Sequence, residues 1–329
     1  MNNINNYYEP FYKPKFINNY NKISIKKLEK NKSIYNVIKL KNNKYLSVSY
    51  NKITIQDILI IENNKKYKNI HKLKESSHIF NIIELNLIES KNENDITIAY
   101  SINNILKIYS FNSEEYICIF NEHEWAITSI IEFDYGKILT SSNDKTIRLF
   151  DYIEKECILN LLAHDWNINN MILLKNNNNL VGTCSWDKTI KIWEIKEVIL
   201  YSELKGHSDS VNDICEVENK KNLILSVSQD KSIREWDFEK EICLNTFNNV
   251  SLNGISKIIW MNDNVFLTYC DEDVLDFWDY KLKQKFLIFE RNNYHLENYS
   301  IIEENNNKII YLFYLDNIYK ICNNNNNNN

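Results

Sequence analysis

Short apolar runs alternate with polar stretches along most of the chain, and this pattern predicts β-strands separated by turns. The run Leu-Ile-Leu-Ser-Val-Ser at residues 223–228, for example, lies between a Lys-Asn pair and a Gln-Asp-Lys segment. Apolar runs of about four to eight residues bounded by turn-forming residues are typical of strands. No stretch reaches the roughly eighteen consecutive apolar residues of a membrane-spanning helix. The pattern predicts an all-β protein without a membrane span.

In the middle of the chain the pattern repeats every 43 residues, at segments 142–151, 185–194 and 228–237. Each segment carries an aspartate six residues before an aromatic side chain, with a hydroxyl residue four positions before that aspartate. A histidine stands 21 to 23 residues before the aspartate. In chain order, the three sets are His123, Thr140, Asp144 and Phe150; His164, Thr183, Asp187 and Trp193; and His207, Ser226, Asp230 and Trp236.

This unit resembles the WD40 repeat, in which a Gly-His pair, an aspartate and a Trp-Asp pair mark one four-stranded blade. Gly206-His207 and Trp236-Asp237 match the two pairs as they stand, whereas other copies have drifted, for example to Trp193-Glu194. Cys157 and Cys243 also fit, because this family often places cysteine in the fourth strand. The resemblance implies a β-propeller built from four-stranded antiparallel blades.

Weaker copies on both sides of the three clear ones predict seven blades. In the first blade they comprise Ser47, Asn51 and the run 52–60, followed by a lysine- and asparagine-rich connection at residues 62–77; in the second, His78, Asn103 and Tyr109; in the sixth, Asn249, Thr268, Glu272 and Trp278; and in the last, His295, Asp316 and the strand Ile318 to Cys322.

The two ends of the chain predict how the propeller closes. The last blade lacks a fourth strand, and the alternating segment 22–28 is left over before the first blade. If that segment completes the last blade, the ring has no exposed sheet edges there. The sequence therefore predicts one propeller domain at residues 20–322, an N-terminal extension at 1–19 and a disordered poly-asparagine tail at 323–329.

The recurring polar residues are predicted to be structural. His207, Asp230 and Ser226 offer the base, the acid and the hydroxyl group of a hydrolase triad. Similar sets recur in two further repeats, whereas an enzyme needs a single activated nucleophile. The WD40 resemblance implies that each set is a hydrogen-bonded tetrad inside its blade, running from tryptophan through the hydroxyl group and histidine to aspartate. We therefore expect no catalytic residue and no enzyme activity.

The resemblance also implies a face for partner binding. The positions it indicates precede the turn aspartates or lie two residues after the histidines; they are Asn143, Trp186 and Gln229, and Trp125, Trp166 and Asp209. Exposed tryptophans are common at interaction hot spots. The alternative is that each of these tryptophans packs on its own blade. We expect a non-enzymatic scaffold or adaptor that binds protein or peptide partners within a multiprotein complex.

The composition of the chain bears on the ligands and the cellular location that we expect for the protein. The 39 basic and 44 acidic residues give a net charge of −5, without long blocks of like charge, so we expect no nucleic-acid binding. Seven cysteines without Cys-x-x-Cys spacing predict reduced, mostly buried thiols and no metal site or cofactor. The N-terminus lacks a signal-peptide pattern, which favours the cytoplasm or the nucleus. The oligomeric state stays open.

Two alternatives to a scaffold remain weaker. A phosphoinositide-binding propeller of the kind recruited to membranes carries an adjacent pair of arginines, and this sequence has only Arg148, Arg234 and Arg291. A sialidase-like glycosidase carries the turn Ser-x-Asp-x-Gly-x-x-Trp. Residues 185–187 begin that way, but the glycine is absent.

Overall fold

The computed structural model describes residues 15–16, 23–29, 34–40, 45–49, 52–56, 71–86, 96–175, 180–247, 250–251, 253–262, 264–270, 274–290, 296–304, 307–314 and 317–323. Within these ranges the secondary structure is β-strand and turn, and no helix is present. Accordingly, the described part of the chain offers no helix that could cross a membrane. The all-β class predicted from the apolar pattern is confirmed for these residues.

The strands form six four-stranded sheets and one five-stranded sheet, and paired strands run antiparallel. Such sheets are consistent with propeller blades, and we number them as blades 1 to 7. Blades 1 to 3 contain β3 (Ile34–Lys39), β4 (Tyr45–Ser49), β5 (Lys52–Gln56) and β6 (His71–Lys74); β7 (Ile82–Glu84), β8 (Thr97–Ile102), β9 (Ile105–Ser110) and β10 (Glu115–Phe120); and β11 (Ile127–Asp134), β12 (Lys137–Ser142), β13 (Thr146–Asp151) and β14 (Glu156–Leu162).

Blades 4 to 7 continue the series. They contain β15 (Ile168–Leu173), β16 (Leu180–Ser185), β17 (Thr189–Glu194) and β18 (Ile199–Lys205); β19 (Val211–Glu216), β20 (Leu223–Ser228), β21 (Ile233–Asp237) and β22 (Ile242–Phe247); β23 (Ile255–Asn262), β24 (Val265–Cys270), β25 (Val274–Asp279) and β26 (Gln284–Glu290) with β1 (Lys15–Phe16); and β27 (Leu296–Glu304), β28 (Asn307–Tyr314) and β29 (Asn317–Asn323) with β2 (Ile23–Glu29).

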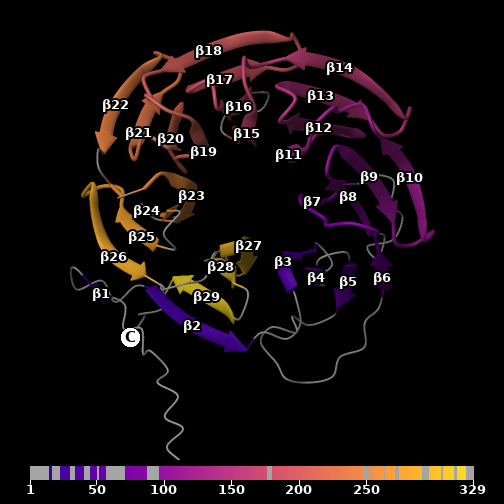
Figure 1. Ribbon diagram of the computed structural model, residues 1–329, viewed down its shortest axis with the longest axis horizontal. Coiled ribbons are helices and arrows are strands. Elements are labelled where there is room, and N and C mark those ends of the chain that lie inside the picture. The colour runs from indigo at the N-terminus through magenta and orange to yellow at the C-terminus, as the bar shows by residue number, and fades with distance from the viewer. Residues whose placement is uncertain are drawn as a thin grey trace, which may run out of the picture.

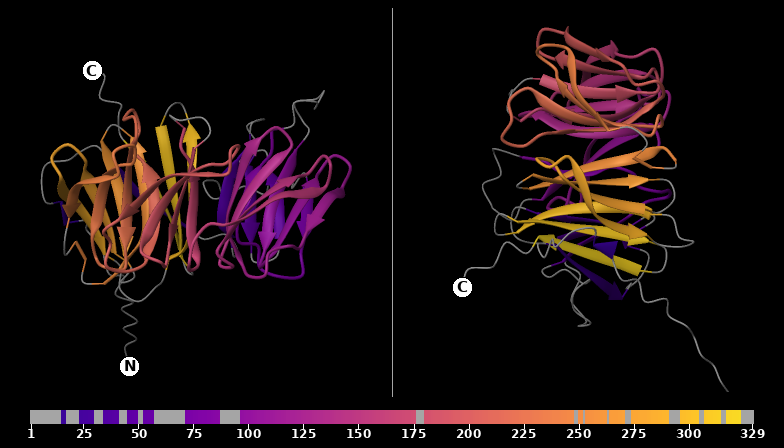
Figure 2. Two further views of the ribbon diagram at one scale, coloured as in Figure 1. Left: turned by 90° about the horizontal axis from the view of Figure 1, so that it is seen from above. Right: turned by 90° about the vertical axis from the view of Figure 1, so that its left-hand side faces the viewer.

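The blades stand side by side around a common axis, with the first strand of each toward the centre and the last on the outside (Figure 1). Neighbouring inner strands contact one another, for example β11 with β15 and β19 with β23. Figure 2 shows the strands running between the two faces of the molecule, so the connecting turns gather on these faces. Turns from successive blades are thereby brought together on the same face.

Two N-terminal strands join the sheets of distant blades. β2 pairs with β29 along its whole length, from Ile23 opposite Asn323 to Glu29 opposite Asn317. Asn323, which the sequence assigned to the tail, therefore ends a strand, and residues 324–329 lie outside the described residues. β1, within the predicted extension, pairs with β26, so blade 6 has five strands and not the predicted four.

The hydrophobic core lies between the blades. Successive residues of a strand point to opposite sides of the sheet, and in β12 Ile138 packs toward blade 2 whereas Leu139 packs toward blade 4. Both side chains are fully buried. Through this two-sided packing the second strands of blades 2 to 5 are buried at nearly every position, including their serine and threonine residues. Burying each aliphatic side chain contributes roughly 1.5–3 kcal/mol.

Asparagine side chains tie the inner strands of blades 4 and 5 to the next blade. Asn169 and Asn212 occupy β-bulges in the first strands of blades 4 and 5. Their Nδ2 groups donate to the carbonyl oxygens of Val211 (2.8 Å) and Ile255 (2.8 Å) in the following blade. A bulge turns a side chain away from the regular pleat, and here it directs an amide across the gap between two sheets.

The first blade differs from its prediction. The connection predicted at residues 62–77 contains the fourth strand β6 at residues 71–74, which pairs with β5. β5 ends at Gln56, and the remainder of the predicted run, residues 57–60, lies outside the described residues. The strand was missed because its His-Lys-Leu-Lys sequence is mostly polar, and only Leu73 among residues 72–74 is buried.

Candidate partner-binding face

In blade 5 four buried polar groups form one chain of hydrogen bonds. Trp236 Nε1 donates to Ser226 Oγ at 2.8 Å. Ser226 Oγ lies 2.7 Å from His207 Nε2, and His207 Nδ1 lies 2.8 Å from Asp230 Oδ2. A carboxylate only accepts, so His207 carries its proton on Nδ1, and Nε2 accepts from the serine hydroxyl. Both nitrogens of the imidazole are therefore occupied within the blade.

Blade 4 repeats this geometry with a threonine. Trp193 Nε1 donates to Thr183 Oγ1 at 3.0 Å, and Thr183 Oγ1 lies 2.8 Å from His164 Nε2. His164 Nδ1 lies 2.7 Å from Asp187 Oδ2. The same chain of contacts in two blades, 43 residues apart in sequence, is a property of the repeat.

Blade 3 keeps only three of the four members. His123 Nε2 lies 2.7 Å from Thr140 Oγ1, and His123 Nδ1 lies 2.7 Å from Asp144 Oδ2. Phe150 has no N–H group to donate, and its ring packs against the imidazole of His123 with the centroids 6.2 Å apart. The aromatic position in this blade therefore contributes packing in place of a hydrogen bond.

The turn aspartates also hold the loops above the tetrads. Asp230 Oδ1 accepts from the backbone N–H of Ser232 (3.0 Å) and from its hydroxyl (2.6 Å), while Oδ2 accepts from the N–H of Ser208 (3.0 Å). Asp144 and Asp187 make the equivalent contacts with Thr146 and Glu124, and with Thr189 and Asp165. One carboxylate thus fixes a β-turn and the loop that follows the histidine.

Burial and hydrogen bonding set the ionisation of the tetrads. Burial opposes ionisation of Asp144, Asp187 and Asp230, but bonds from the histidines and the neighbouring hydroxyl groups outweigh it and hold each carboxyl pKa well below its usual range. Burial lowers the pKa of His164 and His207, and the attraction of the partner aspartates offsets only part of this effect. At neutral pH these two histidines are neutral beside ionised carboxylates.

Acidification is expected to destabilise the protein. Because the pKa values of His164 and His207 are lowered on folding, the unfolded chain binds more protons once the pH falls below about 6.5. Each histidine then removes up to about 1.4 kcal/mol of unfolding free energy per pH unit. Urea unfolding at pH 7, 6 and 5 measures the slope, and His207→Gln should make it shallower. An equal slope in that variant would contradict the assignment.

Blade 2 places a carboxylate where the other blades have a histidine. In blade 3 the histidine lies seven residues before the β11 residue that pairs with Thr140. In blade 2, Ile82 of β7 pairs with Tyr100, and the residue seven positions before Ile82 is Glu75. The prediction of His78 for this position is therefore wrong by three residues. The strand register that decides the position was not visible in the sequence.

Glu75 is buried and collects three donors. Its carboxylate accepts from the hydroxyl groups of Tyr100 and Tyr116, the latter at 2.7 Å, and forms an ion pair with Lys107 Nζ at 2.8 Å. Burial opposes ionisation, but these bonds lower the pKa of Glu75 below its usual value. A buried charge is stable only when it is paired and hydrogen-bonded, and this cluster meets both conditions.

Blade 6 retains the aromatic end of the tetrad. Trp278 Nε1 donates to Thr268 Oγ1 at 3.0 Å, as the spacing of these residues predicts. The residue at the histidine position, seven before the partner of Thr268 on β23, is Ser251. Asn249 and Glu272, predicted for this blade, lie outside the described residues, as do His295 and Asp316 of blade 7.

The six residues predicted for partner binding lie on one face of the blades. They are Trp125, Asn143, Trp166, Trp186, Asp209 and Gln229, and we call this surface the tryptophan face. Three belong to the turns between second and third strands, and three to the connections that enter a new blade. Trp125, Trp166 and Trp186 are 66, 58 and 53% exposed. Their side chains are thus not buried in their own blades.

Hydrogen bonds to the backbone hold the loops of the tryptophan face. Ser142 Oγ donates to the carbonyl oxygen of Trp125 at 2.9 Å, and Ser185 Oγ donates to that of Trp166 at 3.2 Å. Lys145 Nζ lies 5.4 Å from the centroid of the Trp166 ring, within the range of a cation–π contact. These contacts hold the backbone at Trp125 and Trp166 and place a cation beside the Trp166 ring.

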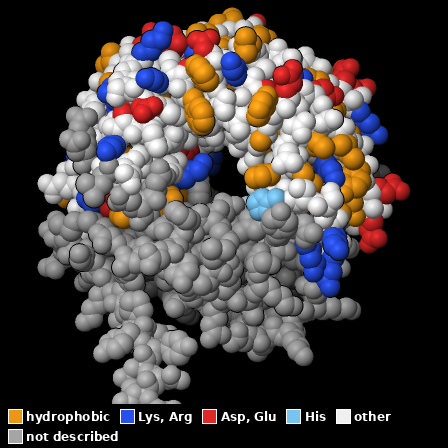
Figure 3. Space-filling view, viewed as in Figure 1, with side chains coloured by type: hydrophobic (Ala, Val, Ile, Leu, Met, Phe, Trp, Pro, Cys, Tyr) orange, Lys and Arg blue, Asp and Glu red, His pale blue; other side chains and the backbone are white. Residues whose placement is uncertain are grey.

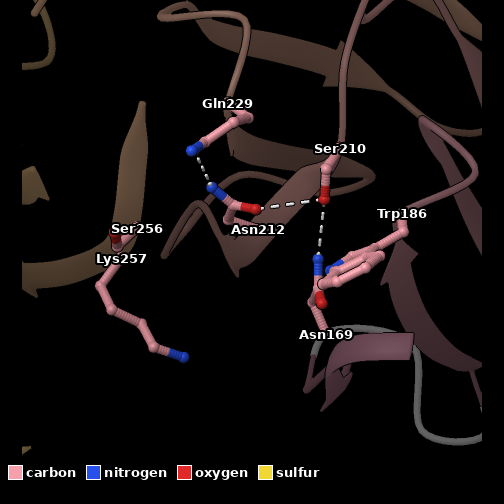
Figure 4. Close-up of a pocket in the computed structure, with 7 residues that line it drawn as sticks. All are labelled: Asn169, Trp186, Ser210, Asn212, Gln229, Ser256 and Lys257. Carbon is pink, nitrogen blue, oxygen red and sulfur yellow. Dashed lines mark hydrogen bonds between the residues drawn. The ribbon is translucent and has the colours of Figure 1, made fainter. Parts of the chain in front are cut away.

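A hollow of about 520 Å³ opens between blades 4, 5 and 6 beside Trp186 (Figure 4). Its lining residues are Asn169, Trp186, Ser210, Asn212, Gln229, Ser256 and Lys257. Lys257 reaches in from β23, opposite Trp186. The space-filling view shows an opening at the centre of the molecule, with hydrophobic side chains around the upper part of that opening (Figure 3).

A hydrogen-bonded row of side chains lines the hollow. Asn169 Nδ2 donates to Ser210 Oγ (3.1 Å), Ser210 Oγ donates to Asn212 Oδ1 (3.2 Å), and Asn212 Nδ2 donates to Gln229 Oε1 (3.1 Å). A Cβ atom on Gly254 would lie 1.7 Å from Gln229 Oε1. Because glycine has no Cβ atom, position 254 leaves space for the side-chain amide of Gln229.

The structure brings together some of the predicted residues and adds others. Trp186 and Gln229 line the hollow, whereas the remaining members of the tryptophan face do not. Asn169, Asn212 and Ser256, which also line it, were not predicted from the sequence. Asn169 and Asn212 each lie five residues after the repeat histidine. That recurring spacing was a signal by which they might have been found.

The cysteines depart from their prediction. Cys184 and Cys270 are buried, Cys243 is exposed, and Cys118, Cys157 and Cys215 are half-buried. The expectation of mostly buried thiols is therefore wrong for these residues. The described part of the chain holds no group of three or more histidine, cysteine, aspartate or glutamate residues placed to bind a metal.

The family model for the WD domain, G-beta repeat (WD40) matches residues 114–151, 155–194 and 199–237. Each match runs from the fourth strand of one blade to the third strand of the next. The chain contains three WD40 repeats. The sequence matches no curated protein at a significant level. WD40 repeats generally mediate interactions between proteins, and this WD40-repeat protein presents its exposed tryptophans on loops that its tetrads hold in place.

Proposed function

We propose that this WD40-repeat protein is a non-enzymatic scaffold that binds a peptide or protein partner on the tryptophan face, as a subunit of a larger complex. The observation that carries the proposal is the exposure of Trp125, Trp166 and Trp186 on loops of neighbouring blades. Covering large apolar rings that are exposed to water lowers the free energy of the complex, and tryptophan is enriched at binding hot spots. The bonds beneath them reduce the ordering cost of binding.

A closed ring of seven blades would make this scaffold rigid. The pairing of β2 with β29 supports closure, because the N-terminal strand then completes the blade formed by the C-terminal strands. Contact between β27 of blade 7 and β3 of blade 1 supports it as well. A ring of this kind keeps the loops of the tryptophan face at fixed spacings, so that one extended partner can contact several blades.

The tetrad geometry favours a scaffold over a hydrolase. A nucleophilic hydroxyl and its histidine must reach bound substrate. Ser226 is fully buried and accepts from Trp236, and His207 is buried beside it. The same arrangement recurs in blade 4, which is a reason to assign both sets to stability.

Replacing Trp186 with alanine tests the proposal. Because Trp186 stands at the hollow and is half exposed, its loss should weaken partner binding by about ten-fold or more, as expected for a hot spot. Tagged full-length protein is purified from its native cell extract, and the proteins that bind it are quantified by mass spectrometry. At least one partner should be lost from Trp186→Ala while the melting temperature stays unchanged.

Tyr135→Ala is the matched control. Tyr135 is an exposed aromatic residue in the turn between β11 and β12, and antiparallel topology places that turn on the opposite face. If Trp186→Ala retains every partner that the unaltered protein retains, or if Tyr135→Ala loses the same partners, the tryptophan face is not the binding surface.

A further inference from the structure

The outer edge of blade 6 is covered by a strand of the chain itself. β1 adds to the last strand of that sheet, with Lys15 opposite Ile288 and Phe16 opposite Leu287. On the inner side of β26, Leu287 pairs with Phe277, the residue just before the blade tryptophan. β1, a strand of two residues, thus pairs with β26 in a defined register on the rim of the molecule.

Blade 5 presents the same register without a strand on it. Asn245 of β22 pairs with Glu235, the residue just before Trp236, so Asn245 corresponds to Leu287 of blade 6. The next residue, Thr246, therefore corresponds to Ile288. β22 is the last strand of its sheet, and among the described residues no strand pairs with its outer edge.

The side chains of β22 do not protect this edge. Residues 242–246 are all exposed, including Ile242 (45%) and Leu244 (42%). The strand Ile-Cys-Leu-Asn-Thr-Phe contains no charged residue and no proline. Natural edge strands usually carry lysine, proline or inward-pointing charges that oppose pairing with another chain. An uncharged edge with exposed aliphatic side chains is suited to pairing.

The neighbouring blade shows how such an edge is capped and why this one differs. In blade 4, the N–H of Glu203 points away from β17 and donates to Glu241 Oε1 of the next blade at 3.1 Å. Thr246 corresponds to Glu203, and Lys283 of blade 6 corresponds to Glu241. The ammonium group of Lys283 is itself a donor and is paired with Glu235 at 2.6 Å. It cannot accept a hydrogen bond from the N–H of Thr246.

We propose that the outer edge of β22 accepts an extended segment of another protein as a fifth antiparallel strand of blade 5. The segment carries apolar side chains at alternate positions, which cover Ile242 and Leu244, and its backbone pairs with Asn245 and Thr246. β1 on β26 is the same interaction made within the chain. Main-chain bonds supply the affinity of such a complex, and alternate side chains supply its specificity.

A peptide-display experiment on the full chain tests this docking edge. The probe is a library of eight-residue peptides with β-branched or aromatic residues at alternate positions, and the enriched peptides are titrated against the protein and its variants. Leu244→Lys introduces an edge charge at an exposed site, and Thr246→Pro removes the outward N–H. Both should weaken the enriched peptides by about ten-fold or more.

Leu282→Lys is the control, because Leu282 is an exposed leucine in the turn between β25 and β26 and not on an edge strand. It should leave peptide binding unchanged, as should Trp186→Ala on the tryptophan face. Melting temperatures check that the variants fold. If Thr246→Pro does not fold, the result for Leu244→Lys alone decides the test. The proposal is overturned if no peptide is enriched, if the enriched peptides bind Leu244→Lys normally, or if Leu244→Lys instead abolishes self-association of the chain.

Discussion

Replacing His207 with alanine should lower the free energy of unfolding by about 2–4 kcal/mol, one of the two largest effects we expect. The imidazole joins Ser226 to Asp230 inside blade 5, with contacts of 2.7 and 2.8 Å. Its removal leaves a nearly buried carboxylate without its main donor and a buried hydroxyl without its acceptor. The cavity left by the ring adds to the loss.

Urea unfolding at pH 7 measures this effect, with Asp165→Ala as the control. Asp165 is an exposed loop residue directly after His164, and its loss should change the unfolding free energy by less than about 0.5 kcal/mol. A His207→Ala protein as stable as the unaltered chain would show that the tetrad does not stabilise the blade. Loss of partner binding at unchanged stability would assign His207 to the binding surface.

Replacing Glu75 with alanine should cost about 2–3 kcal/mol, because it removes the acceptor of a buried cluster in blade 2. Lys107 Nζ lies 2.8 Å from the carboxylate, and the hydroxyl groups of Tyr100 and Tyr116 donate to it. The lysine side chain is 16% exposed, so water compensates it in part. Tyr100 is fully buried and is left without its carboxylate acceptor.

Two further variants separate charge from hydrogen bonding at this position. Glu75→Gln keeps an acceptor oxygen but loses the ion pair, so its loss of stability in urea should lie between those of the unaltered protein and Glu75→Ala. Glu115→Ala, at an exposed site on β10, should be nearly neutral. If Glu75→Ala unfolds at the same urea concentration as the unaltered protein, the cluster does not replace the histidine network.

The strongest predictions from the sequence concern blades 3 to 5, where spacing alone selected residues that lie within hydrogen-bond distance. The repeat spacing selected Thr183 and Trp193, the WD40 resemblance implied that they bond, and the two bonded atoms lie 3.0 Å apart. This works because a tight turn joins two antiparallel strands, so a fixed number of residues brings the same two positions opposite each other. Drifted copies keep this geometry even where, as at Phe150, the side chain can no longer donate.

Where the turn length changes, the spacing no longer predicts the site. In blade 2 twelve residues separate β7 from β8, whereas in blade 3 two residues separate β11 from β12. The sequence pattern pointed to His78, while the strand register selects Glu75. Because a histidine, His78, lies only three residues from the true position, it was assigned to that position in error.

The sequence by itself determined the repeat, its antiparallel strands and the residues of the tetrads, because these depend on contacts within one unit of about 43 residues. Only the tertiary structure decided what lies between units. The hollow beside Trp186, the asparagine bonds from Asn169 and Asn212, and the docking of β1 on β26 join residues from different blades. Such contacts depend on how neighbouring sheets pack and twist against each other. The spacing of the two asparagines recurs along the chain, but the pattern within one unit does not show what their side chains contact.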